Sequence, residues 1–126
     1  MGEGMMTVLF PWPPRELSPN SRVHWTKKHR ATKAYKTSCW YACHAERPML
    51  PYTYLNIKFS PPSARRADLD NMLASFKAGI DAISEVLGVD DSKFTITISK
   101  DKPVKGGCVA VEMDMARAIR PVRDAA

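Results

Sequence analysis

Four short segments of the chain have the apolar patterns that predict β-strands. They lie at residues 7–10, 52–59, 94–98 and 109–113. The first is a brief apolar run that ends at prolines, which cannot donate hydrogen bonds to a sheet. In the second, apolar side chains alternate with polar ones, so we expect Leu55, Ile57 and Phe59 to share a buried face. The last two alternate similarly and flank Lys105-Gly106-Gly107, which predicts a hairpin between them.

Two longer segments have the helical spacing of apolar residues. The first runs from Thr26 to about Glu46, and the second from Leu69 to Leu87, where Gly88 ends it. The predicted order is therefore β-α-β-α-β-β. This order predicts an α/β fold in which a mixed sheet is packed by two helices. We expect one compact domain over residues 1–126, with residues 1–5 and 116–126 loosely ordered.

Composition narrows the class of protein. With 126 residues, 44% of them hydrophobic, the chain has enough apolar residues for one core. No apolar run reaches membrane-spanning length and no secretion signal is visible, so we expect a cytoplasmic protein without a membrane partner. Cys39, Cys43 and His44 are candidates for a zinc site, but they lack a Cys-x-x-Cys spacing, and packing in the core is the favoured interpretation.

Positive charge is concentrated in the first half of the chain. Residues 1–60 contain nine Lys or Arg and three acids, whereas residues 61–126 contain ten of each, within a net charge of +6. A stretch without acids supplies most of this excess. Its candidate DNA-binding residues are Arg22, Lys27, Lys28, Arg30 and Lys33. Such a surface suits a polyanion such as nucleic acid, although a solvated basic helix would look the same in sequence.

Asp68-Leu69-Asp70-Asn71 is the strongest candidate for chemistry. Residues two apart on an extended backbone share a face, so Asp68 and Asp70 would repel each other unless they held a cation or a proton. Mg²⁺ prefers carboxylate oxygens together with water and phosphate. Arg65 and Arg66 directly before this motif would attract a phosphate backbone. The motif therefore predicts phosphodiester chemistry, with helix capping as the structural alternative.

The predicted second helix adds further polar groups to this site. Asp70, Lys77 and Asp81 fall on one stripe beside its apolar face. Lys77 is placed to neutralise a phosphate, or else forms an ordinary ion pair with Asp81 one turn away. Asp91 follows the helix, where the chain can turn back toward the first acids. Trp12, in the loop after the first strand, is suited either to stacking on an unpaired base or to packing over the core.

Taken together, these motifs resemble the RusA family of Holliday-junction resolvases. The similar segments, in order, are Phe10-Pro11-Trp12-Pro13-Pro14, Arg65-Arg66, Asp68-Leu69-Asp70-Asn71, Lys77-Ala78-Gly79-Ile80-Asp81-Ala82-Ile83, Asp90-Asp91-Ser92 and Lys105-Gly106-Gly107. The resemblance implies a homodimeric, Mg²⁺-dependent endonuclease that resolves four-way DNA junctions by paired symmetric nicks. It also implies that Asp68, Asp70 and Asp91 bind the metal and that Lys77 acts beside them. No nucleotide cofactor is expected.

Two positions depart from the family pattern. Ala67 stands where the family has a basic residue, which leaves Arg66 to contact the phosphate, and Lys77 lies seven residues beyond Asp70 instead of one helical turn. The alternative function is a DNA-binding module without catalysis, in which the acids only cap helices and turns.

Overall fold

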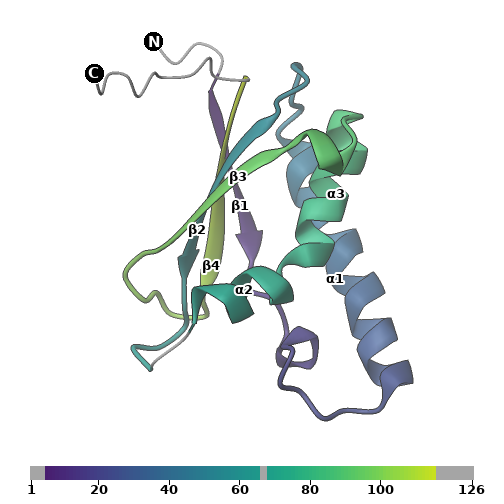
Figure 1. Ribbon diagram of the computed structural model, residues 1–126, viewed down its shortest axis with the longest axis vertical. Helices are drawn as coiled ribbons and strands as arrows, with labels where there is room; N and C mark the ends of the chain where they lie inside the picture. The colour runs from purple at the N-terminus through teal and green to yellow at the C-terminus, as the bar shows by residue number, and fades with distance from the viewer. Residues whose placement is uncertain (1–4, 66–67, 116–126) are drawn as a thin grey trace.

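A mixed β-sheet forms the scaffold of the molecule, and helices cover one of its faces (Figure 1). The computed structural model describes residues 5–65 and 68–115. Within these ranges the strands are β1 (Met6–Pro11), β2 (Tyr54–Ser60), β3 (Thr95–Lys100) and β4 (Cys108–Asp114), and the α-helices are α1 (Trp25–Ala45), α2 (Leu69–Ser75) and α3 (Lys77–Leu87). The predicted α/β class, mixed sheet and single compact domain are confirmed. Of the termini that we expected to be loosely ordered, residues 1–4 and 116–126 lie outside the described residues.

The strand order corrects the predicted hairpin. The sheet runs β1-β4-β2-β3, with β4 antiparallel to both of its neighbours and β3 parallel to β2. β2 therefore lies between β3 and β4, although these two strands follow each other in the chain. The connection passes the end of β2, where the backbone N–H of Asp101 donates to the carbonyl oxygen of Phe59 (2.8 Å) and that of Val104 to the carbonyl oxygen of Pro61 (3.0 Å). The glycines specify that the chain reverses, but long-range pairing decides which strands become neighbours.

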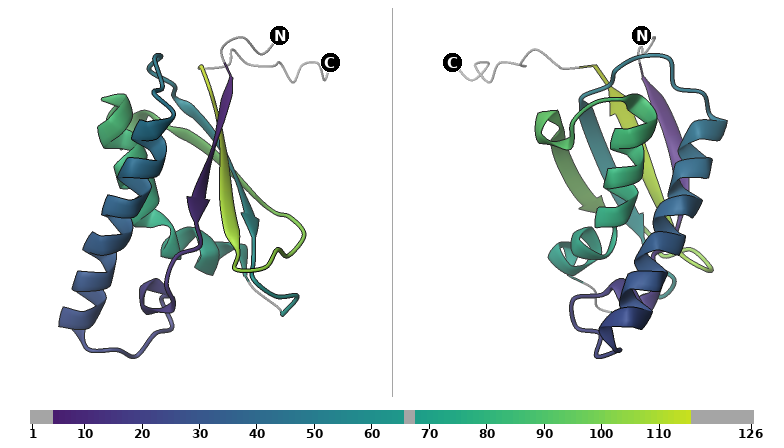
Figure 2. Two further views of the ribbon diagram at one scale, coloured as in Figure 1. Left: turned by 180° about the vertical axis from the view of Figure 1, so that it is seen from behind. Right: turned by 90° about the vertical axis from the view of Figure 1, so that its right-hand side faces the viewer.

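Alternation in the strands separates a core face from an open face. Leu55, Ile57 and Phe59 are fully buried, as predicted, and Val111 and Met113 of the adjacent β4 join them. The intervening residues of both strands are only partly covered. The helices pack on the core face, where α1 and α3 lie side by side (Figure 2).

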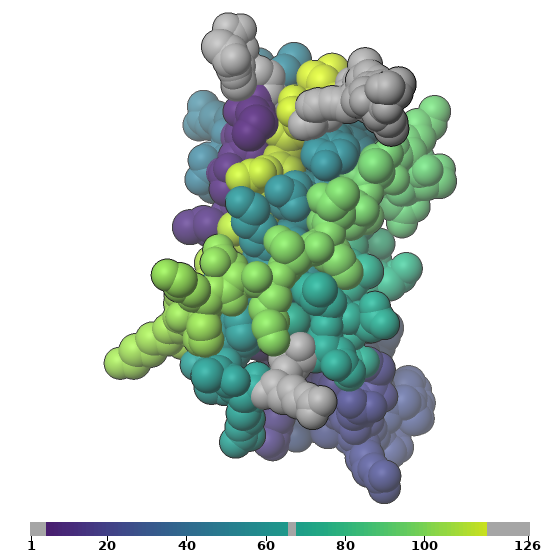
Figure 3. Space-filling model, turned by 60° about the vertical axis from the view of Figure 1, so that its left-hand side comes forward, coloured from purple at the N-terminus to yellow at the C-terminus, as the bar shows by residue number. Residues whose placement is uncertain are grey.

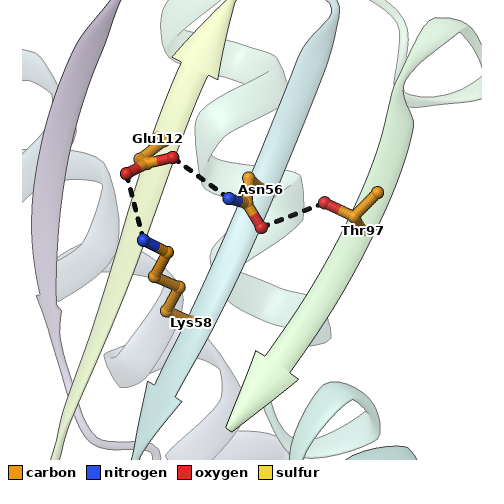
Figure 4. A network of polar contacts seen from close by, with 4 residues as sticks. All are labelled: Asn56, Lys58, Thr97 and Glu112. Atoms are coloured by element: carbon orange, nitrogen blue, oxygen red, sulfur yellow. Dashed lines mark hydrogen bonds and ion pairs between the residues drawn. The ribbon is translucent and has the colours of Figure 1, made fainter. Parts of the chain in front are cut away.

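On the open face, polar side chains are linked across three strands (Figure 4). The amide nitrogen of Asn56 donates to Glu112 Oε1 (3.0 Å) and Lys58 Nζ donates to Glu112 Oε2 (3.2 Å). The hydroxyl of Thr97 donates to Asn56 Oδ1 (3.0 Å). The hydrogen bonds from Asn56 and Lys58 hold the pKa of Glu112 below its ordinary value. These bonds connect β3, β2 and β4 in the order that the backbone ladder gives.

The sequence predicted one continuous second helix, but the structure has two helices in its place. α2 and α3 meet at Phe76, whose backbone leaves the helical conformation (φ −94°, ψ 4°). Its ring is fully buried, with centroids 5.6 Å from Phe10, 6.3 Å from Tyr35 and 6.1 Å from Phe59. Gly79 makes room for this ring, because a Cβ there would lie 2.3 Å from it. The helix therefore changes direction where Phe76 enters the core. The apolar spacing of the sequence did not predict this change.

No helix in the described part of the chain combines the length and the apolar character needed to cross a bilayer.

Two neighbouring glycines allow a matched test of packing in the connection before β4. Gly106 and Gly107 both have left-handed backbones (φ +80° and +75°), but only Gly107 has an obstacle: a Cβ there would lie 2.7 Å from the Trp12 side chain. We expect Gly106→Ala to lower the free energy of unfolding by about 1–2 kcal/mol, which is the backbone cost alone. We expect Gly107→Ala to cost roughly 1–3 kcal/mol more, because Trp12 must move. Urea denaturation measures both; equal losses would contradict this packing.

Candidate active site

A cavity of about 570 Å³ between α2, α3 and β3 brings several of the predicted residues together. Its polar lining consists of Asp70, Lys77, Asp81 and Asp91, and its apolar wall includes side chains of β3. Figure 3 shows this side of the molecule, where the light-green β3 segment meets the teal segment of α2. The cavity therefore combines three carboxylates and one ammonium group, which come from α2, α3 and the short 3-10 helix after α3.

Local structure explains this convergence. Asp70 lies in the first turn of α2, and Lys77 and Asp81 occupy successive turns of α3. After α3, Gly88 adopts a left-handed conformation (φ +69°), and the chain enters a short 3-10 helix, Asp91–Lys93. This reversal returns Asp91 to the cavity that Asp70 lines.

Asp68 faces a different cavity, of about 500 Å³, which it shares with Trp12, Arg15 and Asn71. Our argument from an extended backbone is therefore wrong for this pair of acids. Asp68 is extended (φ −83°, ψ 136°) but Asp70 is helical, and residues two apart on a helix point about 200° away from each other. Of the three acids that the family pattern implies, the structure brings Asp70 and Asp91 to one cavity and places Asp68 at its neighbour.

Within residues 5–65 and 68–115, no three His, Cys, Asp or Glu side chains are grouped so as to hold a metal ion by themselves. Mg²⁺ does not require such a cage, because it keeps several water ligands and is often held by only one or two carboxylates together with substrate phosphate. Asp70 and Asp91 supply oxygen donors of this kind. The donor chemistry of the cavity fits Mg²⁺, for which waters and phosphate would supply the remaining ligands.

The capping interpretation applies to one acid and not to its neighbours. Asp90 caps the 3-10 helix: its carboxylate accepts from the backbone N–H of Ser92 (3.2 Å) and from the Ser92 hydroxyl. These bonds hold the pKa of Asp90 below its ordinary value. Asp68 occupies the position before α2 but makes no side-chain cap bond. Among the described residues Asp91 likewise receives no side-chain hydrogen bond, and its side chain is exposed.

The ion pair between Lys77 and Asp81, which was the alternative role for Lys77, does not form within 4 Å. Among the described residues, the ion pairs within 4 Å are Lys36 with Glu85, and Lys58 with Glu112. Asp81 was on the predicted polar stripe but was not among the predicted site residues. Its spacing of one turn from Lys77 was the sequence signal for its place in the cavity.

The predicted DNA-binding residues do not form one uniform surface. Lys28 lines a cavity of about 340 Å³ together with Lys77 and Asp81, so it lies beside the candidate site. Lys33 lines another cavity on α1, next to Lys36 and Trp40. The remaining described members, Arg22, Lys27, Arg30 and Arg65, are exposed. Arg66, together with Ala67, lies outside the described residues.

The helical cysteines belong to the core. Cys39 and Cys43 are fully buried on the inner side of α1. Burial raises the pKa of each thiol to about 11, which keeps both protonated near neutral pH. His44 is exposed and stacks on Trp40 (ring centroids 4.6 Å apart). Packing accounts for all three side chains.

Comparison with known proteins shows a similarity to a protein that is itself uncharacterized. An uncharacterized protein of Xylella fastidiosa (strain Temecula1 / ATCC 700964) is 40% identical over 99 residues, covering 71% of this chain. The match spans 63% of the length of that relative. No family model matches the chain.

Adjacent acids with different surroundings give a test of the site. Asp90→Ala removes a cap and should lower the free energy of unfolding, whereas Asp91→Ala removes no described hydrogen bond and should leave it nearly unchanged. Because the folded state lowers the pKa of Asp90 from 3.8, its contribution is present above that pH and is lost as the pH falls through the folded-state pKa. Urea denaturation at pH 7 and pH 2.5 measures this, and equal stabilities of the two variants at pH 7 would refute the assignment.

Proposed function

We propose that this protein is a Mg²⁺-dependent endodeoxyribonuclease that resolves four-way DNA junctions by paired symmetric nicks, as a homodimer. The observation that supports it most is the cavity that Asp70, Asp81, Asp91 and Lys77 line together. Among the described residues, none of these acids has an ion-pair partner within 4 Å. Carboxylates that share a cavity with a lysine offer oxygen ligands to a cation, and phosphodiester hydrolysis uses such a cation.

Each residue has a role in this proposal. Asp70 and Asp91 would hold Mg²⁺, and Asp68, at the neighbouring cavity, is the third acid that the family resemblance implies. The ion, when bound, polarises the scissile phosphate and lowers the pKa of an attacking water. The ammonium of Lys77 would stabilise the negative charge that develops on the phosphate oxygens.

The path of the DNA follows from the basic residues near this cavity. Lys28 shares a cavity with Lys77 and Asp81, so a phosphate next to the scissile one would meet it. Exposed Lys27 and Arg30 lie further around α1 and would contact the backbone at a distance from the reaction. Such contacts favour polyanions irrespective of sequence.

The homodimer follows from the symmetry of the substrate. A four-way junction has approximate two-fold symmetry, and its resolution requires two opposed cuts. Each chain would contribute the cavity that Asp70 and Asp91 line, so two chains related by a two-fold axis would supply both sites.

A DNA-binding module without catalysis is the second candidate. It is favoured by the position of Asp68 outside the cavity that Asp70 and Asp91 line, and by the lack of a three-ligand group among the described residues. This candidate predicts binding to branched DNA that is the same with Mg²⁺ and with EDTA, and no cleavage.

The central test uses a supercoiled plasmid that extrudes a cruciform. With Mg²⁺, we expect the wild-type protein to convert the plasmid to a linear form by paired nicks, and EDTA should stop the reaction. Asp70→Asn should lower the cleavage rate by roughly a thousandfold or more, because metal-assisted charge stabilisation is worth several kcal/mol. Its affinity for a junction should be equal or higher, since one negative charge is lost. Gel analysis of the plasmid and a binding titration measure these effects.

Asp101→Asn is the matched control, since it removes an exposed carboxylate on the β3–β4 connection away from the cavity. It should cleave at the wild-type rate. Sedimentation should show a dimer at micromolar concentration. Wild-type cleavage by Asp70→Asn would overturn the nuclease site, whereas a monomer that leaves only unpaired nicks would overturn the resolvase assignment alone.

Variants of two adjacent lysines can distinguish general attraction of DNA from a direct role in the candidate active site. Lys27→Ala and Lys28→Ala should each reduce the slope of log affinity against log salt by about 0.9, because each removes one phosphate contact. Only Lys28→Ala should also slow cleavage of bound junction, by about tenfold, because Lys28 shares a cavity with Lys77. Single-turnover rates at saturating protein measure this, and equal rates for the two variants would place Lys28 outside the site.

A further inference from the structure

The cavity beside Asp68 has the features of a pocket for a planar aromatic ligand. It encloses about 500 Å³ between the segment that follows β1 and the first turns of α2. Trp12 and Met72 give it apolar walls, Asn71 and Ser75 supply polar groups, and Arg15 lies on the same lining. Apolar surfaces with a few placed polar groups are typical of small-ligand sites in proteins.

The tryptophan wall is held in place from behind. The indole of Trp12 meets the buried ring of Phe59 edge to face, with centroids 6.2 Å apart and planes at 87°. Gly107 backs the same side chain so closely that a Cβ there would lie 2.7 Å from it. Trp12 is therefore fixed by the core and still lines the cavity. A ligand stacking on it would meet a preorganised surface, which lowers the entropic cost of binding.

The polar groups of the cavity have unused hydrogen-bonding capacity. The hydroxyl of Ser75 donates to the backbone oxygen of Asn71 (3.0 Å), which leaves its own oxygen as an acceptor. The side-chain amide of Asn71 makes no hydrogen bond with a described residue, and it offers both donors and an acceptor. Such groups match the edge of a nucleobase. The exposed guanidinium of Arg15 can pair with the phosphate that a base carries.

We propose that this cavity binds one unstacked nucleobase of the DNA strand that is cut, next to the scissile phosphate. The inference rests on the proposed nuclease function and adds a base-reading subsite to it. Asp68 is the link, because it lines this cavity and directly precedes the turn that carries Asp70. Trp12 stacks on the base, Asn71 and Ser75 contact its edge, and Arg15 contacts its phosphate. The subsite makes cleavage depend on the nucleotide beside the cut.

An abasic junction tests the subsite with the full-length protein and Mg²⁺. For wild-type protein, removing the base at one of the two nucleotides that flank the cut should slow single-turnover cleavage at least fivefold, since stacking of one base on an aromatic side chain is worth about that much or more. For Trp12→Leu, the intact junction should already be slow, and removal of the base should have no further effect. Trp12→Phe should restore most of the dependence on the base.

Trp40→Leu is the matched control, because Trp40 lines a separate cavity on α1. It should show the same abasic penalty as wild type. Asn71→Ala should reduce the differences in rate among the four bases at the sensitive position while keeping the stacking effect. If Trp12→Leu does not fold, Asn71→Ala decides the question, because unchanged rate differences among the four bases in that variant would show that the base is read elsewhere.

The outcomes separate the subsite from the function on which it rests. If wild-type protein cuts intact and abasic junctions at equal rates, the subsite is wrong and the nuclease function stands. If the junction is not cut by wild-type protein, the proposed function fails and the subsite fails with it. Equal abasic penalties in wild type and Trp12→Leu would show that the base is read elsewhere.

Discussion

The burial of Phe76 is the constraint on which the rest of the structure depends. Its ring contacts aromatic side chains from β1, α1 and β2, and it sits at the junction of α2 and α3. The Phe76 ring is closely packed, because even a methyl group on Gly79 would overlap it. The direction of α2 relative to α3 is thereby set by the core. Because Asp70 belongs to α2 and Lys77 to α3, the same contact sets the shape of the cavity that they line.

The acids of the candidate site share one cavity with one lysine. Some acids elsewhere have partners: Glu112 is bonded to Asn56 and Lys58, and Asp90 caps the turn before β3. The acids of the cavity have no such partner among the described residues. Their carboxylate oxygens are open to a cation, which the proposed nuclease function requires. This argument supports the nuclease proposal independently of the resemblance to resolvases.

The order of the sheet also bears on the site. The insertion of β2 between β3 and β4 places β3 at one edge, where it forms a wall of the acidic cavity. The parallel pairing of β2 with β3 requires a crossover, and α2 and α3 provide it. The elements that carry Asp70 and Lys77 are therefore the connection that the topology demands.

The sequence by itself determined the elements that depend on local periodicity. The alternation in β2 and the helical spacing in α1 both appear in the structure, because side-chain direction follows directly from a period of two or 3.6 residues. The reversal at Gly106-Gly107 also appears, because glycine readily adopts the positive φ that both residues have. It also identified Asp70, Asp91 and Lys77 of the cavity, and it placed Asp81 on the same polar stripe without assigning it to the site. Only the tertiary structure decided that β2 separates β3 from β4, that the second helix breaks at Phe76, and that Asp68 and Asp70 face different cavities. These outcomes depend on contacts between residues far apart in the chain. A local sequence pattern does not predict the energies of such contacts.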